Sequence, residues 1–144
     1  MSTSMLVILS ILGGIAVALQ GQFMGILDQR IGSKESVFIT YAGGGVLAVL
    51  MMMIARGGHL SAWQSAPWYA FTAGALGLVI VATFGYTVPR LGLTTALTVI
   101  VASQLVIAVL IDYFGLFGAS VRTLDWPCMT GLALLILGAW LVLR

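Results

Sequence analysis

The chain has 144 residues, of which 61% are hydrophobic and 7% charged, and its six Lys or Arg and four Asp or Glu give a formal net charge of +2. An ordinary soluble domain is about 45–50% apolar and about 25% charged, so this composition excludes a soluble enzyme, a disordered chain and a nucleic-acid-binding protein. The sequence therefore predicts an integral membrane protein whose first partner is the lipid bilayer.

Charged and turn-forming residues divide the apolar sequence into five segments, and crossing a bilayer takes roughly 20 apolar residues. The segments predict an all-α membrane protein with helices over residues 5–27, 36–55, 67–88, 93–113 and 127–143, in a single transmembrane domain spanning 1–144. We expect residues 28–30 to end the first helix, and Ser33 or Ser36 to cap the second. Pro67 suits the first turn of the third helix, and residues 89–92 predict a short break after it. The N-terminal residues lack Lys and Arg, which predicts a retained helix rather than a signal peptide.

The six basic residues are divided unevenly between the two membrane faces. Five spans place Arg56 and Arg122 on the side of the N-terminus, and the other four on the opposite side: Arg30, Lys34, Arg90 and Arg144. The positive-inside rule then predicts the N-terminus outside and the C-terminus inside. So small a bias is expected of a chain that inserts in both orientations, although short loops with few charges also produce it by chance.

Small residues are the groups expected to bring these helices together, because glycine lets helix backbones approach closely in a membrane. The chain has 18 glycines in 144 residues, against an average of about 7%. Three glycines at 43–45 lie in mid-helix and predict either a tight crossing point or a flexible segment beside a cavity. Small residues on one face of the last two helices predict either packing or the seam of a dimer: Thr94, Thr98, Ala102, Gly131 and Gly138.

Uncharged polar residues are the candidates for a solute site, because no Asp, Glu, Lys, Arg or His lies in the central turns of any predicted helix. An amide or hydroxyl in hydrocarbon needs a hydrogen-bond partner, which either a neighbouring helix or a bound solute can supply. We hypothesise solute binding by residues whose polar groups and aromatic faces suit a small neutral or cationic molecule: Gln20, Gln22, Tyr41, Tyr86 and Gln104. The alternative for each glutamine is a hydrogen bond between helices.

Two carboxylates lie at predicted helix ends. Asp112 ends the fourth helix, eight residues after Gln104 and therefore on about the same face. It is either solvated or paired at the interface, or it is a proton or cation site that couples transport. Asp28 ends the first helix near Arg30 and Arg90, where we expect an interfacial ion pair.

The run from Gln104 through Asp112 to Gly115 and Gly118 resembles the signature of the YdcZ-like proteins, within the drug/metabolite transporter superfamily. Residues 14–20 and 91–96 are similar as well, and the resemblance covers nearly the whole chain. It implies five-helix halves that pair antiparallel, either as homodimers of dual topology or as heterodimers of two oppositely inserted proteins. The chain lacks the glutamate that the related small multidrug resistance exporters have in their first helix. It also has Met24 where many YdcZ-like proteins have an Asn.

We therefore expect a multi-pass protein of the bacterial inner membrane that works as a half-transporter. An antiparallel dimer of ten helices would move a small organic solute by alternating access around a midplane site. Its partner is a second copy or a second five-helix half. The alternative is a membrane scaffold or accessory subunit that transports nothing itself. A channel is disfavoured because no charged ring or carbonyl filter is evident.

An enzyme is the least favoured class, because no nucleophile and base lie at a shared depth. The single cysteine, Cys128, excludes an internal disulfide and cysteine-based zinc motifs. No metal or other cofactor is expected.

Overall fold

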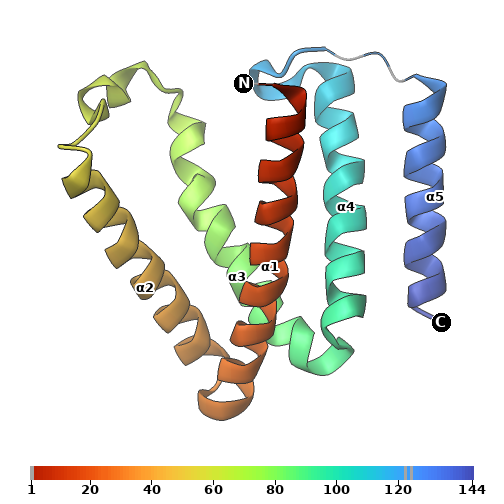
Figure 1. The fold of residues 1–144 in the computed structure, drawn as a ribbon, viewed down its shortest axis with the longest axis horizontal. Coiled ribbons are helices and arrows are strands. Elements are labelled where there is room, and N and C mark those ends of the chain that lie inside the picture. The colour runs from red at the N-terminus through yellow and green to blue at the C-terminus, as the bar shows by residue number, and fades with distance from the viewer. Residues whose placement is uncertain (1, 122, 124) are drawn as a thin grey trace. The chain divides into compact units, whose positions relative to one another are not determined.

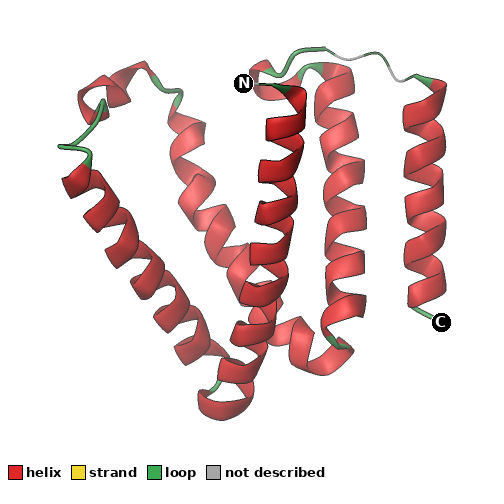
Figure 2. Ribbon diagram, viewed as in Figure 1, coloured by secondary structure: helices red, strands yellow, loops and turns green. Residues whose placement is uncertain are grey.

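The computed structural model describes residues 2–121, 123 and 125–144, and every regular element in them is a helix (Figure 1, Figure 2). This confirms the prediction of an all-α protein. Five α-helices make up most of the chain: α1 Thr3–Ile31, α2 Ser33–Ile54, α3 Ala73–Leu91, α4 Leu93–Phe114 and α5 Trp126–Val142. Three short 3₁₀ helices lie between them: η1 Leu60–Ser65, η2 Trp68–Thr72 and η3 Leu116–Gly118.

Four helical segments of the described chain are long and apolar enough to cross a membrane. They are α1, α2, α4 and the segment Trp68–Leu91, in which η2 runs directly into α3. The third segment begins as the 3₁₀ helix η2, and Pro67 is its N-cap in an extended conformation rather than a residue of its first turn as predicted. The apolar helix α5 has 17 residues, and at about 1.5 Å per residue it is about 26 Å long, slightly short of the roughly 30 Å hydrocarbon layer.

Single glycines make the turns that join α1 to α2 and α3 to α4. Gly32 has φ 100° and ψ 161°, and Gly92 has φ 81° and ψ 153°, conformations that residues with a Cβ rarely adopt. Because glycine reverses the chain in one residue, α1 continues to Ile31 and α3 to Leu91. The prediction that residues 28–30 end the first helix is therefore wrong, and the short break predicted at residues 89–92 is reduced to Gly92.

The serine caps expected at the start of α2 are wrong as well. Gly32 holds the N-cap position, and no side chain caps the helix there. Ser33 instead donates to a carboxylate oxygen of Asp28, and Ser36 donates to the carbonyl oxygen of Met24 at 3.1 Å. Both serines therefore tie α2 to α1.

The chain forms two compact units, Met1–Arg90 and Leu91–Arg144. In the first unit, α1, α2 and α3 meet near Gly32, at the lower end of these helices in Figure 1. The buried residues of this unit all lie in that region: Gly21, Met24, Gly25, Ser36, Phe84, Gly85 and Val88. This is the core of the first unit.

Two glycines allow the close approach of helices in this core. A Cβ on Gly25 would lie 3.0 Å from Val88 Cγ1, and one on Gly85 would lie 3.4 Å from Met24 Cε. The expectation that glycines mark packing sites is thus confirmed for this pair. Other glycines of the unit would place a Cβ in open space: Gly13, Gly14 and Gly43 to Gly45.

In the second unit, α4 and α5 pack side by side. A shallow groove of about 380 Å³ runs between them, lined by Val99, Ala102, Ser103, Val106, Ile136, Ala139, Trp140 and Leu143. Gly115 ends α4 in the left-handed conformation, with φ 62°, which is common at helix C-termini.

Gly32→Ala is expected to lower the free energy of unfolding by about 1–3 kcal/mol, because a residue with a side chain is strained at this φ. The new Cβ would also lie 2.7 Å from Glu35 Oε2. Gly43→Ala is the matched control, since its Cβ would meet nothing within 4 Å and alanine favours a helix by up to about 1 kcal/mol. Denaturant unfolding in detergent micelles measures both. A Gly32→Ala protein as stable as the parent would contradict the single-glycine turn.

Candidate functional site

A groove along α1 and α2 of the first unit is the candidate solute site. Its volume is about 430 Å³, and it is lined by Ala16, Leu19, Gln20, Phe23, Met24 and Leu27 of α1 with Thr40 of α2. The only polar side chains in this lining are the Gln20 amide and the Thr40 hydroxyl, and the hydroxyl donates to the Ser36 carbonyl oxygen at 2.9 Å. A concave apolar surface with a few polar groups is typical of small-molecule sites.

Of the two glutamines predicted in the site from α1, Gln20 lines this groove and Gln22 does not. At 3.6 residues per turn, two residues separate their side chains by about 200° around the helix. Neither amide makes a hydrogen bond within the part of the chain that the structure describes. Neither glutamine therefore bridges two helices of one copy, and Gln20 presents an unpaired amide to the groove.

Tyr41 joins α2 to α3 in this conformation. Its hydroxyl donates to the carbonyl oxygen of Gly74 at 2.8 Å, and Gly77, one turn further along α3, leaves the space that the hydroxyl occupies. The predicted contact between Tyr41 and a solute stays a prediction. The structure adds that its hydroxyl already has a partner in the protein.

Tyr86 lies near the C-terminal end of α3, in a cluster with Arg90, Asp28 and Ser33. The guanidinium carbon of Arg90 lies 3.7 Å from the centroid of the Tyr86 ring, a cation–π contact. Nη1 of Arg90 donates to the Tyr86 carbonyl oxygen at 2.7 Å and lies 3.5 Å from Asp28 Oδ2. The expected ion pair of Asp28 and Arg90 is confirmed. The aromatic face predicted to hold a cationic solute holds a cation of the protein itself.

Gln104 and Asp112, the other predicted site residues, lie in the second unit. Gln104 is exposed on α4, and its amide has no hydrogen bond within the described residues. Asp112 is half-buried near the end of α4 and forms no ion pair with any described residue. Its coupling role stays a prediction, and Arg122, placed on the same membrane face by the sequence, lies outside the described residues.

The residues predicted to form a dimer seam lie on α4 and α5. A Cβ on Gly131 or Gly138 would meet nothing within 4 Å. Thr98 donates to the Thr94 carbonyl oxygen within α4 at 2.7 Å, while Ala102 lines the groove between α4 and α5. The two glycines thus leave room for another backbone, whereas Ala102 is part of a contact within the chain.

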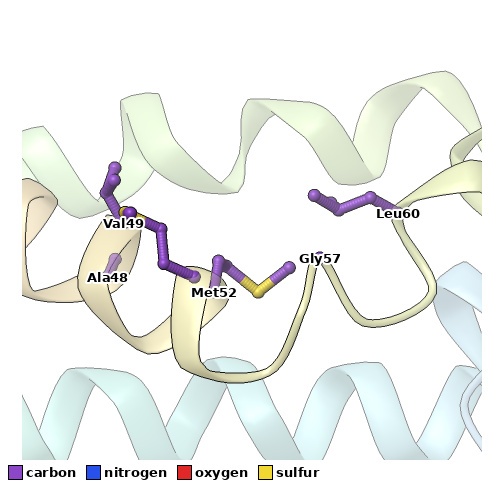
Figure 3. A pocket seen from close by; sticks show the side chains of 6 residues that line it. Ala48, Val49, Met52, Gly57 and Leu60 are labelled. Carbon is purple, nitrogen blue, oxygen red and sulfur yellow. The ribbon is translucent and has the colours of Figure 1, made fainter.

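A second hollow lies on α2 and the turn that follows it (Figure 3). Its volume is about 440 Å³, and it is lined by Ala48, Val49, Met52, Met53, Gly57 and Leu60. The Met52 side chain reaches toward Gly57 (Figure 3). No polar side chain lines this hollow, so it offers no group that could orient a polar solute.

Sequence reasoning missed the buried pair of Ser36 and Met24, which are 0% and 2% exposed. It also left Thr40 out of the site. A signal was available, because Gly32, Ser36 and Thr40 are spaced by four and therefore share one helix face. Small and hydroxyl-bearing residues on one face mark the side of α2 that packs on α1.

Comparisons with known proteins agree with the helical pattern. A family model described as "Putative inner membrane exporter, YdcZ" matches residues 5–141. Inner membrane protein YdcZ of Escherichia coli (strain K12) is 30% identical over 149 residues, covering 100% of this chain and 98% of the relative. No solved structure matches the chain. The resemblance drawn from the sequence is therefore confirmed.

Tyr41→Phe is expected to lower the free energy of unfolding by about 0.5–1.5 kcal/mol, because it removes one hydrogen bond between helices and keeps the ring. Tyr113→Phe is the matched control, since the structure gives the Tyr113 hydroxyl no hydrogen bond within the described residues. Thermal unfolding in detergent compares the two. Equal stability of both variants would mean that the Tyr41 hydroxyl does not bind Gly74 in solution.

Proposed function

Since the chain belongs to the YdcZ family of inner membrane exporters, we propose that it exports a small neutral or cationic organic solute through a site that includes the α1–α2 groove. The protein is a multi-pass integral protein of the inner membrane, and its family is one of transporters rather than enzymes. The solute class follows from the groove, which combines apolar walls with an amide and lacks any charged side chain.

The observation that carries this proposal is the unpaired amide of Gln20 in an otherwise apolar groove. An amide without a hydrogen-bond partner in an apolar medium costs about 2–7 kcal/mol. The hydroxyls of Ser36, Thr40 and Tyr41 donate to carbonyl oxygens of the chain, so their needs are met. The Gln20 amide needs a partner that the described residues of the chain do not supply, and a polar solute in the groove is such a partner.

The complete site is proposed to form in an antiparallel dimer of ten helices, made with a second copy or a second five-helix half. The unpaired amides of Gln22 and Gln104 support this arrangement, because they too need partners in a bilayer. Gly131 and Gly138 support a seam on α5, since small residues let helices approach closely. The small charge bias between the faces is compatible with both orientations.

Alternating access is the proposed mechanism. Two inverted halves exchange conformations, so that a site between them opens to one face and then to the other. In this mechanism Gln20, Gln22 and Gln104 bind polar groups of the solute, and the rings of Tyr41 and Tyr86 contact its apolar part. Asp112 stays the proposed coupling residue.

Gln20→Ala is expected to lower solute export by about tenfold, because it removes the hydrogen-bonding group of the groove. Gln64→Ala is the matched control, since it makes the same change at an exposed position of η1. A panel of small amines and neutral solutes in proteoliposomes provides the measurement. If neither variant nor parent moves any solute above the lipid background, a membrane scaffold becomes the better interpretation.

Variants with a fixed orientation are expected to be inactive alone and active together, because an antiparallel homodimer needs one copy in each orientation. Lysines at Ser61, Gln64 and Ser65 raise the basic count of the N-terminal side from two to five against four, which favours the inverted orientation. Gln29→Lys strengthens the opposite bias. C-terminal reporters give the orientation, and full export from either variant alone would contradict the homodimer.

A further inference from the structure

We propose that Asp28, Arg90 and Met24 form a gate between α1 and α3, beside the floor of the α1–α2 groove at the Gly32 end of these helices. The inference rests on the proposed function, because a gate requires a transported solute. None of these three residues was predicted to bind the solute, couple transport or form the dimer seam. Asp28 and Arg90 were expected only to form an ion pair at the membrane interface.

The proposed gate lies beside the floor of the groove, the end nearest Gly32. Met24 and Leu27 line the groove, and Asp28 is the next residue after Leu27. Met24 is 2% exposed, and a Cβ added to Gly85 would lie 3.4 Å from its Cε, so its side chain fills the space between α1 and α3. Beyond this methionine, the carboxylate of Asp28 faces Arg90 of α3 at 3.5 Å. Both contacts join α1 to α3 beside the groove, so a solute that leaves the groove between these two helices would pass them.

The opposite end of the groove is open. From the Gly32 end, α1 and α2 diverge toward the N-terminus of α1 (Figure 1). Gly13 and Gly14 of α1, and Gly43 to Gly45 of α2, would place Cβ atoms in open space. In this conformation α1 and α3 are therefore in contact at the gate, whereas α1 and α2 diverge away from it.

A hinge lies directly beside the gate. Pro89 is inside α3 and has no N–H, so it cannot donate to the carbonyl oxygen of Gly85 as other helical residues would. Missing hydrogen bonds of this kind are the usual cause of helix bending. The turn that carries Arg90 is therefore less firmly held to the rest of α3, and it can move when the gate opens.

Opening the gate leaves both charged groups with partners. The side chain of Arg90 is 49% exposed, so water can solvate its guanidinium when the contact with Asp28 breaks. The carboxylate of Asp28 still accepts the hydrogen bond from the hydroxyl of Ser33, at the start of α2. The exposed fractions of the two side chains, 7% for Asp28 and 49% for Arg90, place the pair at the edge of the core, where water reaches it. These features suit an ion pair between Asp28 and Arg90 that can break and form again during transport.

Labelling of a buried thiol tests the gate without any solute. Ser36→Cys in a Cys128→Ser background places a thiol at a position that is 0% exposed in the closed conformation. Adding Asp28→Asn or Arg90→Gln is expected to raise the rate of maleimide labelling about tenfold, because a pair with one buried partner is lost. Asp125→Asn, the same change at an exposed carboxylate, is the control. Equal rates for Asp28→Asn and Asp125→Asn would overturn the proposal.

A disulfide across the gate tests its role in transport. Gly25→Cys with Val88→Cys, again with Cys128→Ser, suits a disulfide, because a Cβ on Gly25 would lie 3.5 Å from that of Val88. Oxidation is expected to reduce export to the lipid background, and a reductant to restore it. Unchanged export by the cross-linked protein would overturn the gate. If the reduced protein exports nothing while labelling still responds to Asp28→Asn, the proposed function fails and the gating motion stands.

Discussion

The close approach of α1, α2 and α3 around Gly25 and Gly85 is the contact on which the first unit depends. In a bilayer, lipid tails compete equally with apolar side chains, so helices associate where small residues bring backbones and polar groups together. Here the glycines accommodate Val88 and Met24, and the buried Ser36 hydroxyl donates to the backbone of α1. Along the N-terminal half of α1 the described residues are exposed, and α1 and α2 diverge there.

The groove and its polar groups follow from this one-sided packing. Helices that meet at one end and diverge at the other leave a concave surface between them, and Gln20 lies on it. Hydroxyls can donate to carbonyl oxygens of a helix, so Thr40 and Tyr41 are satisfied without a second chain. A glutamine amide has two donors and one acceptor, which a helix backbone cannot satisfy so easily. The glutamines are therefore the groups that require a solute or a partner.

The helices could be predicted because charges and turn residues interrupt a nearly continuous apolar sequence. Their ends could not, because Gly32 and Gly92 turn the chain in a single residue, a conformation that sequence pattern alone does not reveal. Among the 18 glycines, sequence could not distinguish Gly25 and Gly85, which pack tightly, from Gly43 or Gly131, which face open space. The predicted ion pair of Asp28 was found because opposite charges at neighbouring helix ends attract. The partner of Tyr41 depends on tertiary structure and was not predicted, whereas the contact of Tyr86 with Arg90 follows from their spacing of four in one helix and was overlooked.

An antiparallel homodimer would place one copy of the gate on each membrane face. Identical gates close with identical free energy, so the inward-open and outward-open states would be equally populated in the absence of gradients. Direction would then come from the solute and coupling-ion gradients, because a ligand that binds both states equally shifts neither. A second five-helix half with other residues at the gate removes this equality and lets the protein favour one face. The choice of partner therefore decides whether the direction of export is set by gradients alone or also by the protein.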